Sequence, residues 1–140
     1  TQRTGRPGMT PKQHRSRPGG MTEARRRATI AASYLELAEV AAAQDGPAVN
    51  TSIGNAALAG IAAGDAICLA AIGERYAGQD HNAAADFLER VDPALGRRLR
   101  SLVGLKSAAH YGDSILTTTD RTAALRHTTA LTEEAKRRTT

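Results

Sequence analysis

A long run of small apolar residues, from Ile53 to Ile72, constrains the fold of this chain more than any other feature. Alanine and glycine dominate the run, which also contains Asn55 and, near its middle, Asp65. A charge in the middle of the run argues against a membrane-spanning helix. Alanine has the highest intrinsic helix propensity, and small side chains let helix axes approach closely. The run therefore predicts a helix buried at the centre of a bundle, with no membrane span.

The remaining sequence favours an all-α fold. Only 3% of the residues are aromatic, so the core must be built from leucine, isoleucine and alanine. A chain of 140 residues fits one domain, and no internal repeat or strand-like alternation is present. We expect an up-and-down helical bundle of about five helices. The expected helices span about 22–44, 51–76, 80–91 and 93–112, and a fifth runs from the cluster at 117–120 to the basic end at 136–138.

The net positive charge of the chain comes from its first 21 residues. Residues 1–21 contain five of the 19 cations and no acid, together with three of the five prolines and four of the 13 glycines. Residues 22–140 carry 14 basic and 14 acidic side chains, which is a balance of zero. We therefore predict a basic, flexible tail over 1–21 and a helical domain over 22–140. The net charge of +5 assigns no binding groove to the domain.

The sequence lacks the residues that several kinds of structural and catalytic site require. Cys68 is the only cysteine, which excludes an internal disulfide or a thiolate zinc cluster within one chain, and its apolar surroundings favour a small buried side chain. We expect a cytoplasmic protein, because a chain with a single cysteine suits a reducing compartment. Secretion is not indicated, since no charged segment followed by an apolar one opens the sequence. No His-Glu-x-x-His pair and no Ser-His-Asp arrangement is present. We expect no metal and no cofactor.

Reactive side chains gather in the stretch from Leu105 to Ile115. Lys106, His110 and Asp113 are separated by four and then three residues, so they would line one face of a helix with Tyr111 on its flank. An imidazole titrates near neutral pH and can act as an acid, a base or a hydrogen-bond donor to phosphate. Lys106 and His110 could bind one phosphate while Asp113 orients the ring. The alternative is a solvated helix end with unrelated surface charges.

Asp65 is the second candidate, because a carboxylate in an alanine-rich run must find a partner or face a cleft. Tyr34, Tyr111 or a basic side chain could hold it, which would make its role structural. Lining a ligand-binding cleft is the functional alternative. His81 follows Asp80 at an expected helix start, where a capping turn is the simpler interpretation.

From about residue 25 to 138 the chain resembles the HEPN superfamily of helical domains. The resemblance lies in the order of four elements: the first long helix, the alanine-rich helix with its internal Asp65, the Gly-x-Asp-His turn at 78–81, and the helix that closes on Ala109-His110-Tyr111-Gly112. It implies an up-and-down bundle that is commonly a homodimer. It also implies RNA or nucleotide as ligand, and an antitoxin or a nucleotidyltransferase as protein partner.

Active members of this superfamily resemble metal-independent ribonucleases that use an Arg, usually followed by a polar residue, and a His about four to six residues further on. Here Lys106 stands at the Arg position, and only three residues separate it from His110. This departure favours a non-catalytic or degenerate domain that binds a nucleotide, RNA or a protein through Lys106, His110, Tyr111 and Asp113, with Asp65 as a further candidate.

Two other functions stay open at this point. One is a metal-independent endoribonuclease toxin, in which His110 is the general base and Lys106 or an Arg from a dimer mate stabilises the phosphate charge. The other is a purely structural adaptor, whose important contact is the smooth helix surface at Gly60 and Gly64.

Overall fold

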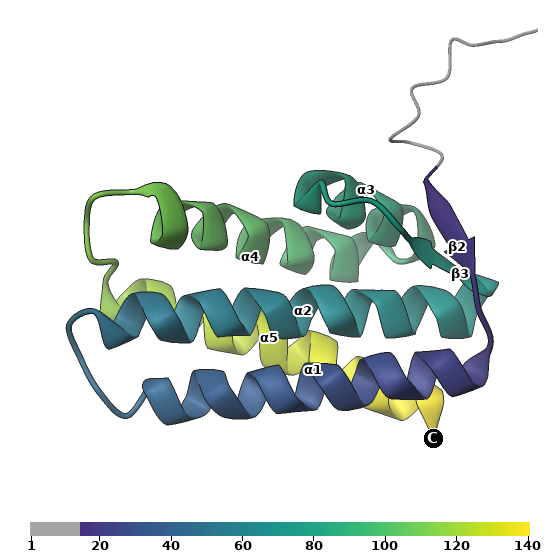
Figure 1. Cartoon of the computed structure of the whole chain (residues 1–140), viewed down its shortest axis with the longest axis horizontal. Coiled ribbons are helices and arrows are strands. Elements are labelled where there is room, and N and C mark those ends of the chain that lie inside the picture. The colour runs from purple at the N-terminus through teal and green to yellow at the C-terminus, as the bar shows by residue number, and fades with distance from the viewer. Residues whose placement is uncertain (1–14) are drawn as a thin grey trace, which may run out of the picture.

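A computed structural model describes residues 15–140 as a bundle of five helices with one short pair of strands (Figure 1). The all-α, up-and-down bundle that the sequence predicts is confirmed. In chain order the elements are β2 (Ser16–Pro18), α1 (Met21–Ala41), α2 (Ala48–Ile72), β3 (Glu74–Tyr76), α3 (His81–Val91), α4 (Pro93–Tyr111) and α5 (Thr118–Thr139).

Helix α2 is the centre of the bundle, because it packs against each of the other four helices (Figure 1). Gly60 shows how its small residues permit this. A Cβ atom at that position would lie 2.6 Å from Cδ1 of Leu102 in α4 and 3.3 Å from Cδ1 of Leu131 in α5. The missing side chain therefore lets three helices pack closely. Leu99, Leu102 and Leu131, which lie at this contact, are among the largest fully buried side chains of the core, together with Ile53, Ile67 and Leu88.

Within residues 15–140, α2 is the one helix that is long and apolar enough to cross a membrane. However, 67% of its most apolar window is buried inside the bundle. The central helix of a bundle can be as long and as apolar as a membrane span, so length and hydropathy do not distinguish the two.

Side-chain caps fix the starts of the last three helices, and the capping turn that the sequence predicts at Asp80 is confirmed. The Asp80 carboxylate accepts hydrogen bonds from the backbone N–H groups of Asn82 and Ala83 at the start of α3. Asp92 caps α4 in the same way, and Pro93 occupies its first turn. Thr117 forms a reciprocal capping box with the third residue of α5. These caps supply partners for backbone donors that would otherwise be unsatisfied.

The first two helices end earlier than expected, and α2 also begins earlier, at Ala48 instead of about residue 51. Helix α1 begins at Met21 after Gly20, and it ends at Ala41 instead of about residue 44. Helix α2 ends at Ile72 instead of about residue 76, because Gly73 adopts the left-handed conformation with φ of 71°. The residues beyond Gly73 then find backbone partners elsewhere in the chain, and this pairing replaces the last helical turn.

Those partners come from the segment that was expected to be a flexible tail. Strand β2 pairs antiparallel with β3, with Ser16 opposite Tyr76 and Pro18 opposite Glu74. The Ser16 hydroxyl also donates to the Glu74 carboxylate at 2.7 Å. Residues 15–20 thus belong to the folded part, contrary to the boundary at 21/22. The rest of the expected tail, 1–14, lies outside the described residues.

Candidate functional site

A small polar pocket lies between the start of α3 and the last turns of α4. Its volume is about 230 Å³. Two of the candidates from the sequence, Lys106 and Tyr111, line it, whereas His110 and Asp113 do not. The other lining residues are Gln79, His81, Asn82, Val103 and Ser107.

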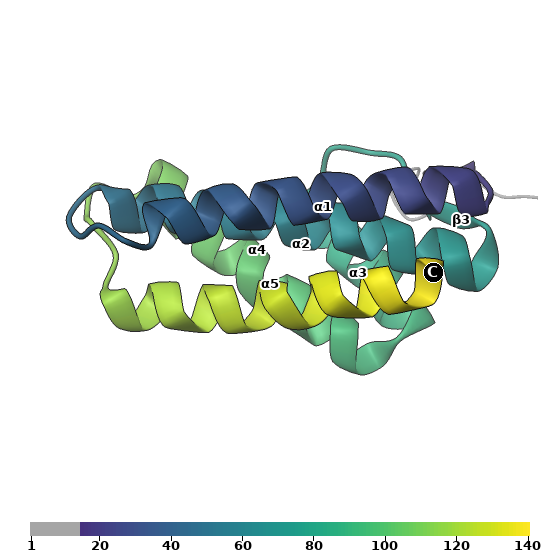
Figure 2. The same ribbon diagram turned by 90° about the horizontal axis from the view of Figure 1, so that it is seen from below.

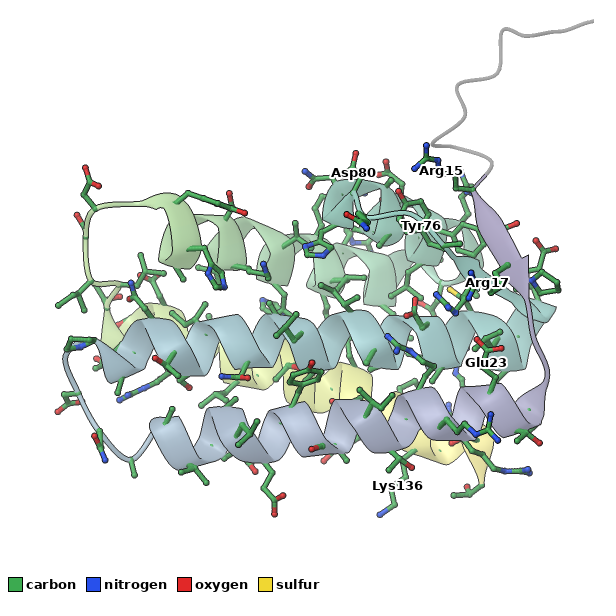
Figure 3. The ribbon with its side chains drawn as sticks, viewed as in Figure 1. Arg15, Arg17, Glu23, Tyr76, Asp80 and Lys136 are labelled. Atoms are coloured by element: carbon green, nitrogen blue, oxygen red, sulfur yellow. The ribbon has the colours of Figure 1, made fainter. Side chains whose placement is uncertain are left out.

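Contacts at the two ends of α3 fix its position beside α4. Gly96 in the first turn of α4 packs directly on the backbone of Glu89 in α3, where a Cβ atom would clash. At the other end of α3, the Tyr76 hydroxyl accepts a hydrogen bond of 3.3 Å from the Asp80 backbone N–H, and both residues lie near the strand pair (Figure 3). Because Asp80 also caps α3, these contacts hold the pocket edge that carries His81.

His81 is the residue at this site whose role the sequence did not reveal. Partial burial lowers its pKa from the ordinary value, and the nearby Lys106 charge lowers it further, while Asp80 acts in the opposite direction. The imidazole is therefore neutral near pH 7, with one nitrogen as donor and the other as acceptor. Its place after a capping aspartate indicated only a helix start. The pocket arises because α4 folds back beside that start, which no local pattern shows.

His110 lies outside the pocket, on the side of α4 that faces α2. Its Nε2 atom would be 3.3 Å from a Cβ atom at position 54, so the ring rests against the bare backbone of Gly54. The ring of Tyr111 is its neighbour, with centroids 6.2 Å apart and an interplanar angle of 49°. His110 is exposed, as is Tyr111 at 82%. The structure thus places Lys106 and Tyr111 in one pocket and His110 beside them.

Asp113 does not share a helix face with Lys106, because α4 ends at Tyr111. Asn50 of α2 holds the loop that follows. Its side-chain amide donates to the carbonyl of Ala109 at 3.3 Å, and its Oδ1 atom accepts from the backbone N–H of Leu116 at 2.8 Å. Asn50 therefore positions the end of α4, a role that sequence reasoning missed because its partners lie about sixty residues away.

Asp65 belongs to a different part of the molecule. It lies 11 residues beyond Gly54, about 16 Å along the axis of α2. The carboxylate pairs with the Arg27 guanidinium at 2.8 Å, so the expected basic partner is present. Burial raises the pKa of Asp65 to about 6, and the Arg27 charge only partly opposes this. Burial, with the charge of Asp65, also raises the pKa of Cys68 to about 12, so this thiol stays protonated.

The pocket can recognise a ligand through hydrogen bonds, the positive charge of Lys106 and the aromatic ring of Tyr111. Over residues 15–140, no three His, Cys, Asp or Glu side chains gather closely enough to hold a metal ion. The pocket offers instead an ammonium group, a neutral imidazole, amides, a hydroxyl and an exposed phenol. Comparison with protein-family models and with curated proteins finds no match to this chain.

Proposed function

We propose that this chain is a non-catalytic, HEPN-like domain that binds a nucleotide unit, either free or within single-stranded RNA, in the pocket between α3 and α4. The observation that carries the proposal is the meeting of Lys106, the neutral His81 and the exposed Tyr111 at one polar pocket. The family resemblance adds an antitoxin or a nucleotidyltransferase as protein partner.

Lys106 and His81 are suited to a phosphate group. A lysine ammonium is a compact charge with three donors, and a neutral imidazole supplies one more donor. In the free protein the Lys106 charge disfavours protonation of His81. A bound phosphate would reverse that effect, because its negative charge stabilises the imidazolium. Binding should therefore raise the pKa of His81.

Tyr111 is suited to a base. Stacking of a base on an aromatic side chain contributes about 1 to 3 kcal/mol and tolerates any base. The pocket, at about 230 Å³, is smaller than the roughly 300 to 1,000 Å³ typical of small-molecule sites. It would hold the phosphate and sugar, with the base lying outside on the Tyr111 ring. Gln79 and Asn82 provide amides for the sugar hydroxyls or the base edge.

The position of His110 supports binding over cleavage. An endoribonuclease that uses His110 and Lys106 needs both groups at the same phosphate. Here Lys106 lines the pocket, whereas Nε2 of His110 faces the backbone of Gly54. Lys106 stands where the active members that the chain resembles have an Arg, and this departure supports the same conclusion.

The test is to measure the affinity of the full chain for AMP and for a short, labelled single-stranded RNA. We expect Lys106→Gln to weaken binding about tenfold, which corresponds to about 1.4 kcal/mol. Lys136→Gln is the matched control, since Lys136 is an exposed lysine of α5 at the opposite edge of the bundle from Asp80 (Figure 3). It should leave the affinity unchanged.

The outcomes separate the alternatives. Binding that Lys106→Gln and Lys136→Gln weaken equally would be unspecific attraction to surface charge, and no saturable binding of either probe would contradict the proposal outright. Saturable binding of RNA without AMP would restrict the ligand to a nucleic-acid strand. Cleavage of the RNA in EDTA that His110→Ala abolishes would overturn the non-catalytic assignment and establish the endoribonuclease.

A further inference from the structure

Another, larger cavity lies at the end of α2, beside the strand pair. Figure 2 shows the end of α2 and strand β3 together at one end of the bundle. The volume of the cavity is about 450 Å³, within the range of roughly 300 to 1,000 Å³ that is typical of small-molecule sites. None of its lining residues lines the pocket between α3 and α4. They come from four elements and are Ser16, Ala71, Ile72, Glu74, Phe87, Arg90 and Val91.

One part of this lining is apolar. Ile72 is the last residue of α2 and is 53% exposed, because the chain turns at Gly73 and continues into β3. The Phe87 ring of α3 is buried, and Ala71 and Val91 complete the apolar lining. An aliphatic group that entered the cavity would remove this surface from water, which the hydrophobic effect favours.

Two groups of opposite charge line the same cavity without pairing with each other. The Glu74 carboxylate accepts a hydrogen bond of 2.7 Å from the Ser16 hydroxyl through Oε1. The Arg90 guanidinium lies over the Phe87 ring, with Cζ 5.3 Å from the ring centroid. Within residues 15–140, neither Glu74 nor Arg90 takes part in an ion pair. Each charge is therefore available to a ligand group of the opposite sign.

Both charges are held in place by the fold. Ser16 lies in β2 and Glu74 in β3, so the hydrogen bond between their side chains joins the two paired strands. The buried Phe87 ring supports the Arg90 guanidinium by a cation–π contact. Groups that are positioned before binding lose less freedom when a ligand arrives. The cavity is thus suited to a small ligand with two charges.

We propose that this cavity binds a free α-amino acid with an aliphatic side chain. The ammonium group of the ligand meets the Glu74 carboxylate, and its carboxylate meets the Arg90 guanidinium, which can donate two parallel hydrogen bonds to it. The side chain of the ligand lies on Ile72 and Phe87. The proposal concerns the end of α2 and stands independently of nucleotide binding beside α4.

The size of the cavity agrees with a ligand that bridges the two charges. A sphere of 450 Å³ is about 9.5 Å across, on the scale of a site for a small ligand. In an α-amino acid the nitrogen lies about 2.5 Å from the carboxyl carbon, and a charge-assisted hydrogen bond adds about 2.8 Å at each end, so the bridge spans about 8 Å. A ligand with a single charge would leave either Glu74 or Arg90 without a partner.

The first experiment is an NMR titration of the labelled full chain with L-leucine. We expect saturable shifts of the signals of Ile72, Phe87 and Arg90, and unchanged signals for Lys106. Glycine carries the same two charges without the side chain, so it should bind at least about tenfold more weakly. Absence of any saturable shift with L-leucine, or equal affinity for glycine, would overturn the proposal.

Paired changes in the ligand and in the chain test the two charged contacts. Glu74→Gln should weaken binding of L-leucine about tenfold, and it keeps an oxygen for the Ser16 hydroxyl. N-acetyl-L-leucine, which lacks the ammonium group, should bind the wild type equally weakly and should lose nothing further on Glu74→Gln. Arg90→Gln and L-leucinamide, which lacks the carboxylate, should behave in the same way. Additive losses in either pair would overturn the assigned contact.

Matched variants separate these contacts from general effects of the surface. Glu36→Gln and Arg26→Gln remove exposed charges from α1, and each should leave the affinity for L-leucine unchanged. Ile72→Gln should weaken binding, whereas Leu37→Gln, at the same exposure of 53%, should not. All the substituted side chains are exposed, so circular dichroism should show full helix content in every variant. A control variant that weakened binding as much as its counterpart in the cavity would contradict the proposal.

Discussion

The polar side chains that lie in or beside the two halves of α2 differ in their surroundings. In the C-terminal half Asp65 is buried, and it is held by Arg27 at 2.8 Å. Beside the N-terminal half, Lys106, His110 and Asp113 are partly or fully exposed, and among the described residues none of the three takes part in an ion pair. The Asp65 carboxylate is therefore engaged within the fold, whereas the side chains on and after α4 are available to a ligand.

Removal of one charge from each half should separate these roles most strongly. Arg27→Ala should lower the free energy of unfolding by about 3 kcal/mol, because it leaves Asp65 buried without its partner. Lys106→Ala should change it by less than about 0.5 kcal/mol, as expected for a surface substitution. Urea denaturation measures both. Equal effects of the two substitutions would show that the Arg27–Asp65 pair contributes nothing particular to the fold.

The packing of α3 on α4 should be the next most sensitive feature, because it shapes the pocket. Gly96→Ala should lower the unfolding free energy by about 2 kcal/mol, since its methyl group meets the Glu89 backbone. Gly104→Ala, on the same helix, meets nothing within 4 Å and should raise that free energy by about 0.5 to 1 kcal/mol through helix propensity. Thermal unfolding would check both. A stabilising Gly96→Ala would mean that α3 can move away from α4 freely.

Protonation of Asp65 should give the buried half a pH dependence of its own. The pKa is raised from the ordinary 3.8 to about 6, so between these values the native state binds the proton that the unfolded state has lost. Stability from this group therefore falls as pH rises through the window, by at most about 1.4 kcal/mol per pH unit. Asp65→Asn removes the effect. Wild type and variant should differ in slope between pH 4 and 6, and identical slopes would refute the raised pKa.

The smallest effect is expected where His110 rests on α2. Gly54→Ala places a methyl group 3.3 Å from Nε2, so the exposed ring must shift by a few tenths of an ångström. Stability should stay within about 0.5 kcal/mol of wild type, while the NMR signals of the His110 ring should move. The ring signals of His81 serve as the control, because that residue lies across α4. Unchanged His110 signals would show that the ring does not rest on Gly54.

The sequence was sufficient for the features that are local. Asp80 marked a helix start because a short side chain before a helix caps its first turn. The same reasoning failed at residues 73–76, because a strand partner in residues 16–18 replaced the last helical turn. Asp65 was expected to need a partner, yet the choice of Arg27 depends on how α1 lies against α2. The helix spacing could group Lys106 with His110, but it could not show that His81 would meet Lys106.

Binding of a nucleotide unit in the pocket between α3 and α4 is best tested by an NMR titration of the labelled chain with AMP. We expect saturable shifts of the signals of His81, Lys106 and Tyr111, a rise in the pKa of His81, and unchanged signals for Arg27 and Asp65. Absence of any saturable shift, or shifts centred on Arg27 and Asp65, would contradict the proposed function.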